Sequence, residues 1–381
     1  MTYLSMTSTL RNEIIQVLDE QGFAFKNNVF QIKNLDILSI REAHFLSRNE
    51  RLDQHKNFIE QYTAKAKNYM LNSSELEPAK IRPRMILVES GSENEKLFRW
   101  WNLTWWSLPF EKAYGRQMRF LIWDEYHNAP MGLIGLQSPI LNWGVRDNYL
   151  NITPEKRDYW INQSMSAQRL GALPPYNKFL GGKLVAMLLA SNEIRMQFHK
   201  KYKSYRTLLK GRILPANLLF ITTTAAYGKS TVYNRLRFDG KKLCEFIGYS
   251  KGHGTFHIPN SLYEGFVNYL KDNDFDPKRS FGNGPSVKLK NIHKTMRLLG
   301  FENGVDHGIK RAVYFFSYVQ NIQEIIHESN KPIWVNRPVR SLTKLWKDRW
   351  LVKRMNDYPE KNLYFSKSDY LSEIEQYFSR N

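Results

Sequence analysis

The first part of the chain has the hydrophobic spacing of helices. Ile14 and Leu18 lie one helical turn apart and Gly22 follows them, so we expect a helix that ends at this glycine. Residues 39–70 are polar and contain no Pro or Gly, which favours one long helix or a pair of helices. Residues 23–32 lie between these segments and are interpreted either as the wing of a winged-helix DNA reader or as part of a helical lid.

Short apolar runs alternate with amphipathic segments from about residue 81 onward. Runs of this kind predict strands, and the longer segments with one apolar face predict helices. The order of the predicted elements is β, α, β, β, β, α, β, α, β. The predicted strands are residues 85–89, 119–124, 132–137, 159–170, 218–223 and 244–249, and the predicted helices are residues 92–106, 181–198 and 230–237.

The remainder of the chain is predicted to be mainly helical, with one strand at residues 312–318. Its segment 331–354 is basic and contains Trp346 and Trp350 at helical spacing, for which we favour a role as core anchors over base stacking. These changes of pattern predict an α+β fold in three parts. The parts are a helical N-terminal region at 1–80, an α+β core at 81–258 and a basic, mainly helical C-terminal region at 259–381.

The composition provides enough apolar material for a large core. Hydrophobic residues make up 42% and aromatic residues 14% of the 381 residues, which excludes disorder as the main state. The lone Cys244 excludes an internal disulfide and a cysteine-rich zinc site, and fits a reducing, cytoplasmic location. The N-terminus has no signal pattern, and apolar runs such as 184–190 are far shorter than the roughly 20 residues that span a bilayer, so we expect no membrane partner.

The charge of the chain is strongly positive and unevenly distributed. Lys and Arg number 56 against 36 Asp and Glu, giving a formal net charge of +20. Residues 195–254 alone hold 13 Lys and Arg and two acidic residues. A surplus of this size attracts polyanions, and nucleic acid rewards clustered cations because each phosphate contact releases counterions. Nucleic acid, with DNA the first choice, is therefore the expected partner.

The order and spacing of the predicted core elements are similar to the GNAT N-acyltransferase fold, a mixed central sheet flanked by helices. Residues 173–182 and the apolar helix after them resemble the turn of that fold that binds the pyrophosphate of acyl-CoA at a helix N-terminus. Lys178 and Gly181 keep the pattern of the turn, but Lys183 stands where a small residue normally lies. Binding of acyl-CoA is therefore left open, and the sequence assigns no cofactor.

Three long blocks carry a closer resemblance. Residues 173–184, 222–235 and 248–259 look like the DruA family of the Druantia anti-phage defence systems, to which domains at the front of some transposases are related. The resemblance extends from about residue 99 to 316. It implies a role in defence against invading DNA, alongside other Druantia components that include a large helicase-like protein. It does not imply a particular reaction.

Two of these blocks offer groups that bind phosphate. The turn at 222–235 combines hydroxyl side chains with Lys229 at the expected N-terminus of a helix, where free N–H groups attract anions. Capping of that helix by Ser230 is the alternative. Residues 248–259, if extended, place His253 and His257 on one face. The predicted nucleic-acid-binding residues are Arg146, Lys178, Lys183, Lys229, Ser230, Arg235, Lys251 and His253, and no metal site is predicted.

Three residues are candidates for catalysis. Asp147 is the first, as a catalytic carboxylate, with a carboxylate that fixes its own loop as the alternative. Because side chains adjacent in sequence tend to point apart, we expect Arg146 and Asp147 to make separate contacts. Tyr227 and His257 are the other two candidates. The chain has no Gly-x-x-x-x-Gly-Lys-Ser/Thr loop, Gly-x-Ser-x-Gly elbow or His-Glu-x-x-His helix, which disfavours a helicase, a lipase-type hydrolase and a zincin.

The sequence thus predicts a DNA-binding component of an anti-phage system that acts through a basic face of a GNAT-like core. That face would combine the 178–183 turn, the 222–235 turn and the 248–257 strand. Two enzymatic alternatives stay open. One is a nuclease or strand-transfer enzyme of the same system, and the other is an acyl-CoA-dependent N-acyltransferase.

Overall fold

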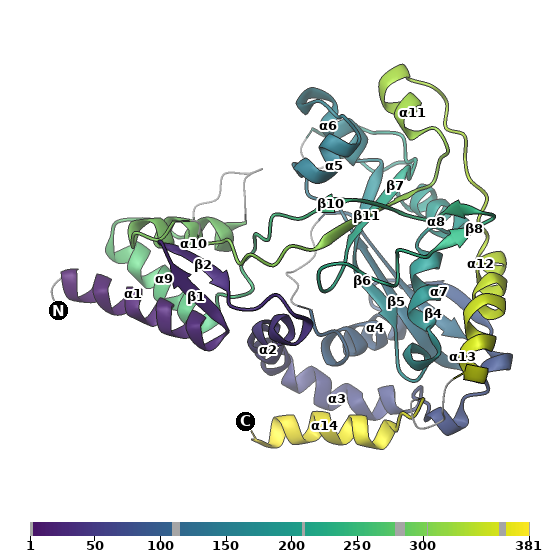
Figure 1. Cartoon of the computed structure of the whole chain (residues 1–381), viewed down its shortest axis with the longest axis horizontal. Helices are drawn as coiled ribbons and strands as arrows, with labels where there is room; N and C mark the ends of the chain where they lie inside the picture. The colour runs from purple at the N-terminus through teal and green to yellow at the C-terminus, as the bar shows by residue number, and fades with distance from the viewer. Residues whose placement is uncertain are drawn as a thin grey trace.

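A mixed sheet forms the centre of the molecule. The computed structural model describes residues 3–108, 115–207, 210–278, 286–302, 304–357 and 363–380. The strands of the central sheet are β3 (Pro83–Leu87), β4 (Gln117–Asp124), β5 (Ala129–Gln137), β6 (Ser164–Ala172), β7 (Phe220–Thr224), β10 (Glu245–Tyr249) and β11 (Ala312–Ser317). Their order in the sheet is β10-β11-β7-β6-β5-β4-β3 (Figure 1), and all neighbours are antiparallel except β6 and β7, which are parallel. The expected α+β class with a mixed, helix-flanked sheet is confirmed.

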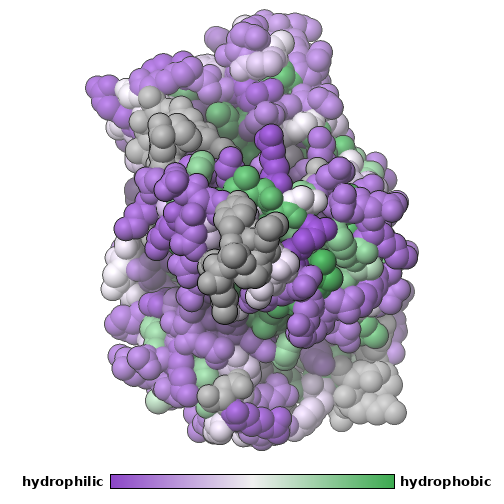
Figure 2. All heavy atoms as spheres, turned by 90° about the vertical axis from the view of Figure 1, so that its left-hand side faces the viewer, coloured by the Kyte–Doolittle hydropathy of each residue, from purple (hydrophilic) through white to green (hydrophobic). Residues whose placement is uncertain are grey.

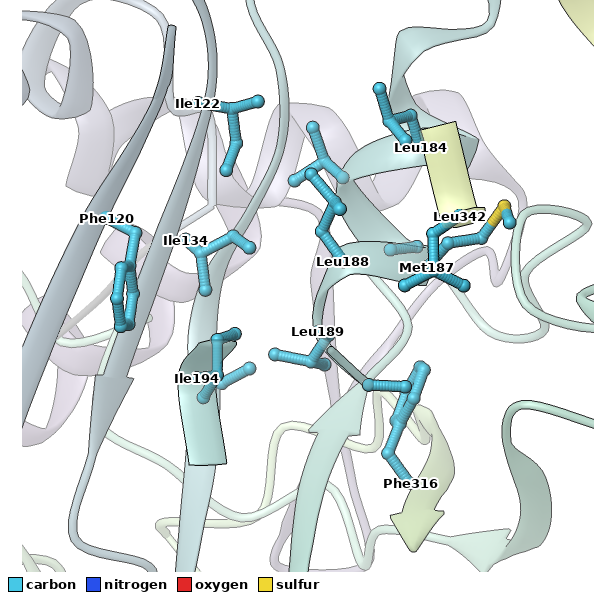
Figure 3. Packing of buried hydrophobic residues seen from close by; sticks show 14 of the residues in the cluster. Phe120, Ile122, Ile134, Leu184, Met187, Leu188, Leu189, Ile194, Phe316 and Leu342 are labelled. Atoms are coloured by element: carbon cyan, nitrogen blue, oxygen red, sulfur yellow. The ribbon is translucent and has the colours of Figure 1, made fainter. Parts of the chain in front are cut away.

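One face of the sheet is covered by α7 (Gly181–Leu188), on which α12 (Val339–Trp346) packs in turn. Leu188 of α7 packs against the sheet, while Leu342 of α12 joins the same cluster from the far side of α7 (Figure 3). Trp346 is fully buried, and its indole Nε1 donates to the Leu180 carbonyl at 3.1 Å. The prediction of Trp346 as a core anchor is confirmed.

The opposite face is covered by α3 (Lys56–Lys67), α4 (Glu93–Thr104) and the C-terminal helix α14 (Lys367–Arg380). Leu121 and Leu133 of the sheet point to this side, because successive strand residues alternate between the faces. The predicted helix pair at 39–70 is α2 (Ile37–Gln54) followed by α3. The helices α8 (Asn192–Tyr202), α5 (Gly144–Tyr149), α6 (Pro154–Ile161) and α11 (Ile322–Glu328) flank the remaining parts of the sheet (Figure 1).

A small lobe stands beside the sheet, at the left of Figure 1. Two chain segments far apart in sequence build it around one apolar cluster. Its hairpin turns at Asn27 and Asn28, whose φ angles of 50° and 61° suit a two-residue turn that needs both residues left-handed. Viewed from this end, the surface is mainly hydrophilic, with hydrophobic residues gathered near the middle (Figure 2). The elements of the small lobe are α1 (Tyr3–Glu20), β1 (Phe23–Lys26), β2 (Val29–Ile32), α9 (Asn260–Asp272) and α10 (Val287–Leu298).

Three predicted elements differ from the structure. The run 159–170 contains the end of α6 and most of β6, which the polar residues Asn162 and Gln163 separate. The predicted helix 181–198 is interrupted near Ser191, where α8 begins anew. Residues 230–236 form turns and no helix, since hydrogen bonds to the sheet hold this segment. None of the helices within the described ranges is long and apolar enough to cross a membrane.

Replacing Leu188 by Ala is expected to lower the free energy of unfolding by about 2–5 kcal/mol, because Leu188 is fully buried where α7 packs on the sheet. Denaturant unfolding followed by circular dichroism measures the change. Leu38→Ala on α2 is the matched control, since Leu38 is 67% exposed, and it should change stability by less than about 0.5 kcal/mol. Equal losses in both variants would contradict the packing described.

Candidate nucleic-acid interface

The segment 225–236, here called the phosphate loop, leaves the end of β7 and is fixed to the sheet rather than folded as a helix. The hydroxyl of Tyr314 on β11 accepts from the Ser230 N–H at 3.2 Å and donates to Asn234 Oδ1 at 2.9 Å. The Ala312 N–H donates to the carbonyl of Gly228, whose φ of 56° a residue with a side chain rarely adopts. The loop is therefore ordered by β11, and the predicted phosphate cradle at a helix N-terminus is wrong in its helical part.

The N-terminal turn of α7 lies against this loop. The Lys183 ammonium donates to the carbonyl of Thr231 at 3.3 Å and lies 5.4 Å from the ring centroid of Trp350. Partial burial and repulsion from Arg235 and Arg349 lower the pKa of Lys183. Arg235 and Arg349 thus both lie near Lys183, and an anion bound beside Lys183 would relieve this repulsion.

Further cations extend this basic cluster along the surface. Lys229, Arg235 and Lys251 are exposed, and within the described residues no hydrogen bond or ion pair engages their charged groups. The Lys229 ammonium lies 5.6 Å from the ring centroid of Phe246 on β10. Lys178 is half-buried, and its carbonyl accepts from Arg354 Nε at 2.9 Å. The structure therefore brings Lys183, Lys229, Ser230 and Arg235 into one region.

Two of the predicted binding residues have protein partners instead. The His253 ring makes an ion-pair contact of 2.8 Å with Asp306 Oδ1 and is about half exposed. Arg146 is fully buried, so its guanidinium does not reach the surface. It donates to the carbonyls of Ile140 and Leu141 at 2.7 and 2.9 Å, which fixes the loop in front of α5.

The predicted separation of Arg146 and Asp147 is wrong. The guanidinium folds back along α5, and its Nε and Nη2 both donate to Asp147 Oδ1, at 2.8 and 2.6 Å. The other carboxylate oxygen contacts Arg157 Nε at 3.1 Å and accepts from the Trp143 N–H at 3.0 Å. Asp147 thus joins the loop, α5 and α6, in the manner of a carboxylate that fixes its surroundings.

The three catalytic candidates do not form one site. Within the described residues, no hydrogen bond, ion pair or ring contact joins any two of Asp147, Tyr227 and His257. The Tyr227 hydroxyl lies 3.3 Å from Ser107 Oγ. The chain turns at Gly252, whose φ is 77°, so the expected extended strand through 257 is absent and His257 faces the interior.

A buried histidine cluster between the small lobe and the sheet was not predicted. The Phe256 ring lies 4.6 Å from the ring of His44 and 4.8 Å from that of His307. The His307 ring is 5.8 Å from that of His257. Arg311 Nη2 lies 3.1 Å from His44 Nε2. Burial lowers the pKa of His44 and of His307 to about 3, and that of His257 to about 4. All three rings are therefore neutral at pH 7.

The described residues contain no group of three His, Cys, Asp or Glu side chains that could hold a metal ion. Cavities of about 770 and 470 Å³ lie elsewhere, the larger between β3 and α12 and the smaller between α6 and α11. The turn at 178–183 lines neither of them. Its Leu180 and Lys178 carbonyls are instead engaged by Trp346 and Arg354 from the C-terminal part of the chain.

The comparisons with known proteins decide the family. The family described as Druantia protein DruA matches residues 34–328. The chain is also 36% identical over 330 residues to a Druantia protein DruA of Escherichia coli (strain UMEA 4076-1), covering 85% of this chain and 81% of that protein. The chain belongs to the DruA family. Membership confirms the family that the sequence resembles, and DruA is a component of an anti-phage defence system. No solved structure matches the chain.

The DruA match includes the central sheet, the phosphate loop and both helices of the small lobe that lie between β10 and β11. It starts after the β1–β2 hairpin and ends with α11. The helices α12 and α14 thus lie outside the DruA match, although α12 packs on α7 at the base of the basic cluster.

Acid should destabilise this DruA-family protein through its buried histidines. Their folded-state pKa values lie below the ordinary value of 6.5, so the unfolded chain binds more protons once the pH falls below about 6.5. Stability contributed by the neutral rings is present above that pH and is lost towards pH 4. The slope should approach about 1.4 kcal/mol per pH unit for each histidine.

Urea unfolding between pH 7.5 and 4.5 measures this loss. The variant His307→Gln removes one of the three titrating rings and should reduce the slope by about one proton. A stability that does not change between pH 7 and 5 would contradict the burial of the cluster.

Proposed function

We propose that the chain is a DNA-binding component of a Druantia anti-phage system and contacts invading DNA through the basic cluster beside the phosphate loop. The observation that carries this proposal is the approach of Arg235 and Arg349 to Lys183, whose ammonium donates to the Thr231 carbonyl and makes no ion pair within the described residues. Lys229 continues the cluster on a loop that β11 holds in place. A loop whose backbone is already held loses less conformational entropy on binding than a mobile one, which suits contact with a phosphate backbone.

We further propose that the sheet is a GNAT-like core. The support is its single parallel pair, β6 and β7, within an otherwise antiparallel sheet, together with α7, which follows β6 through the 173–182 turn. Binding of acyl-CoA draws no support from this turn, because segments of the C-terminal region pack on it and the described cavities lie elsewhere. The core would then be an acyltransferase-like frame used for another purpose.

A nuclease or strand-transfer role draws no support from the candidate residues. Asp147 is surrounded by two arginines and a backbone N–H, and His257 is fully buried. Tyr227, a residue of the phosphate loop, is half-buried against the small lobe, with the Arg41 guanidinium 5.3 Å from its ring centroid. We therefore favour recognition over bond cleavage, with no cofactor assigned.

The proposed setting is the cytoplasm, together with the other Druantia components. The family implies such components, and the resemblance adds a large helicase-like protein as the expected partner. The basic cluster would hold DNA while the partner acts on it. A relation to domains at the N-terminus of some transposases remains a prediction made from the sequence resemblance.

Reversing the charge of the exposed cations should weaken DNA binding. The triple variant Lys229→Glu, Arg235→Glu, Lys251→Glu removes up to three phosphate contacts. Its affinity for a duplex should fall by at least about tenfold at low salt, and the slope of log K against log salt should decrease by about one for each lost contact. Fluorescence anisotropy with a labelled duplex across a salt series measures both quantities, with and without Mg²⁺ so that cleavage is also detected.

A charge-matched variant provides the control. Lys33→Glu, Lys65→Glu and Lys67→Glu change the net charge equally at exposed positions of the N-terminal region. This control should keep most of the wild-type affinity, because only residues at the interface contact phosphate. An equal loss of DNA affinity in both triple variants would contradict the proposal. Failure of the wild type to bind any DNA at low salt would contradict it as well.

A further inference from the structure

A β-bulge brings two exposed aromatic side chains together on β10. Residues 246 and 249 are three apart, so in a regular strand they would face opposite sides of the sheet. The register with β11 shifts between Phe246 and Gly248, which leaves Ile247 as the extra residue of a bulge. Phe246 and Tyr249 therefore lie on one side, with ring centroids 5.1 Å apart and planes at 69°.

Gly248 makes this arrangement possible. Its φ of 134° is one that residues with a side chain rarely adopt, and a Cβ there would lie 3.2 Å from Val145 Cγ1. Phe246 and Tyr249 are 44% and 42% exposed, although each carries a large apolar ring. We call the pair formed by Phe246 and Tyr249 the aromatic platform.

The aromatic platform borders the phosphate loop. The Phe246 ring lies 6.1 Å from that of Tyr314, the residue that fixes the loop through its hydroxyl. The Lys229 ammonium lies 5.6 Å from the Phe246 ring centroid, and Lys251 is exposed two residues beyond Tyr249. A stacking surface thus stands directly beside cations that a phosphate would engage.

We infer that the aromatic platform binds an unpaired base of single-stranded or locally opened nucleic acid. A nucleotide suits this surface because its base can stack on a ring while its phosphate approaches Lys229. In the free protein the Phe246 ring and the Lys229 ammonium engage each other, and a bound nucleotide would offer each of them a partner. An apolar protein surface would cover the rings but would leave the neighbouring cations without counter-charge.

The inference rests on the proposed function and adds the form of nucleic acid to it. A base inside a duplex is stacked on its neighbours and cannot reach a side-chain ring without being flipped out. The basic cluster would therefore hold either form through phosphates, while the aromatic platform would favour chains with unpaired bases.

The test compares the wild type with the double variant Phe246→Ala, Tyr249→Ala on matched ligands. These are a single-stranded oligonucleotide that carries one 2-aminopurine and the duplex of the same sequence. Wild-type protein should change the fluorescence of the single strand on stacking. The double variant should bind the single strand at least about fivefold more weakly and lose the fluorescence change, while its affinity for the duplex stays within about twofold.

Two control variants accompany the test. Tyr205→Ala and Tyr364→Ala remove exposed aromatic rings, 42% and 62% exposed, away from β10, and they should bind both ligands like the wild type. The second control, Phe246→Trp with Tyr249→Ala, keeps one stacking ring. It should bind the single strand more tightly than Phe246→Ala with Tyr249→Ala does. Circular dichroism confirms that each variant is folded.

The outcomes separate the two proposals. If the wild type binds neither ligand, DNA binding itself fails. If the wild type binds and the double variant binds the single strand equally well, the aromatic platform is not a base-stacking site and this inference fails. Equal weakening for single strand and duplex would also overturn the preference for unpaired bases.

Discussion

The insertion of β11 between β7 and β10 is the constraint on which the rest of the structure depends. This strand hydrogen-bonds to both neighbours, and it supplies Tyr314, whose hydroxyl fixes the phosphate loop. Since β10 and β11 are adjacent and antiparallel, the chain between them must leave the sheet and return to it. That excursion contains α9 and α10, and the small lobe therefore grows out of the edge of the sheet.

Strand β11 also places the exposed aromatic residues of β10 beside the cations of the phosphate loop. Pairing of β10 with β11 across a bulge sets the orientation of Phe246 and Tyr249, while pairing of β7 with β11 sets where the phosphate loop begins. The Lys183 ammonium then joins the loop to α7 through the Thr231 carbonyl. Groups from α7, the phosphate loop and β10 thus lie close together although they belong to three separate chain segments, because the central sheet holds each of these segments in place.

The sequence predicted those elements in which buried and exposed residues follow a regular pattern. The strands around residues 119–124, 132–137 and 312–318 were predictable because continuous apolar runs reflect strands that are buried on both faces. Residues 230–237, which include most of the phosphate loop, were predicted as a helix, and Tyr233 and Leu236 among them have helical spacing. They are in fact anchors of a turn that hydrogen bonds to a distant strand maintain.

Parts of the candidate site were beyond any local pattern. Charge density drew attention to the stretch that contains Lys229 and Arg235, and the resemblance of the 178–183 turn drew attention to Lys183. The pairing of Arg146 with Asp147, in contrast, depends on a side chain folding back along its own helix. The histidine cluster combines residues from α2 and from both sides of α9 and α10, and only the tertiary fold brings them together.

The divided origin of the small lobe has a consequence for biosynthesis. Its apolar cluster needs Leu18 and Phe30 from the beginning of the chain and Phe266 and Met296 from far downstream. At about 5–20 residues per second, a ribosome takes on the order of tens of seconds to make the intervening stretch. The nascent helix α1 and the β1–β2 hairpin therefore keep their apolar faces uncovered until α9 and α10 have been synthesised.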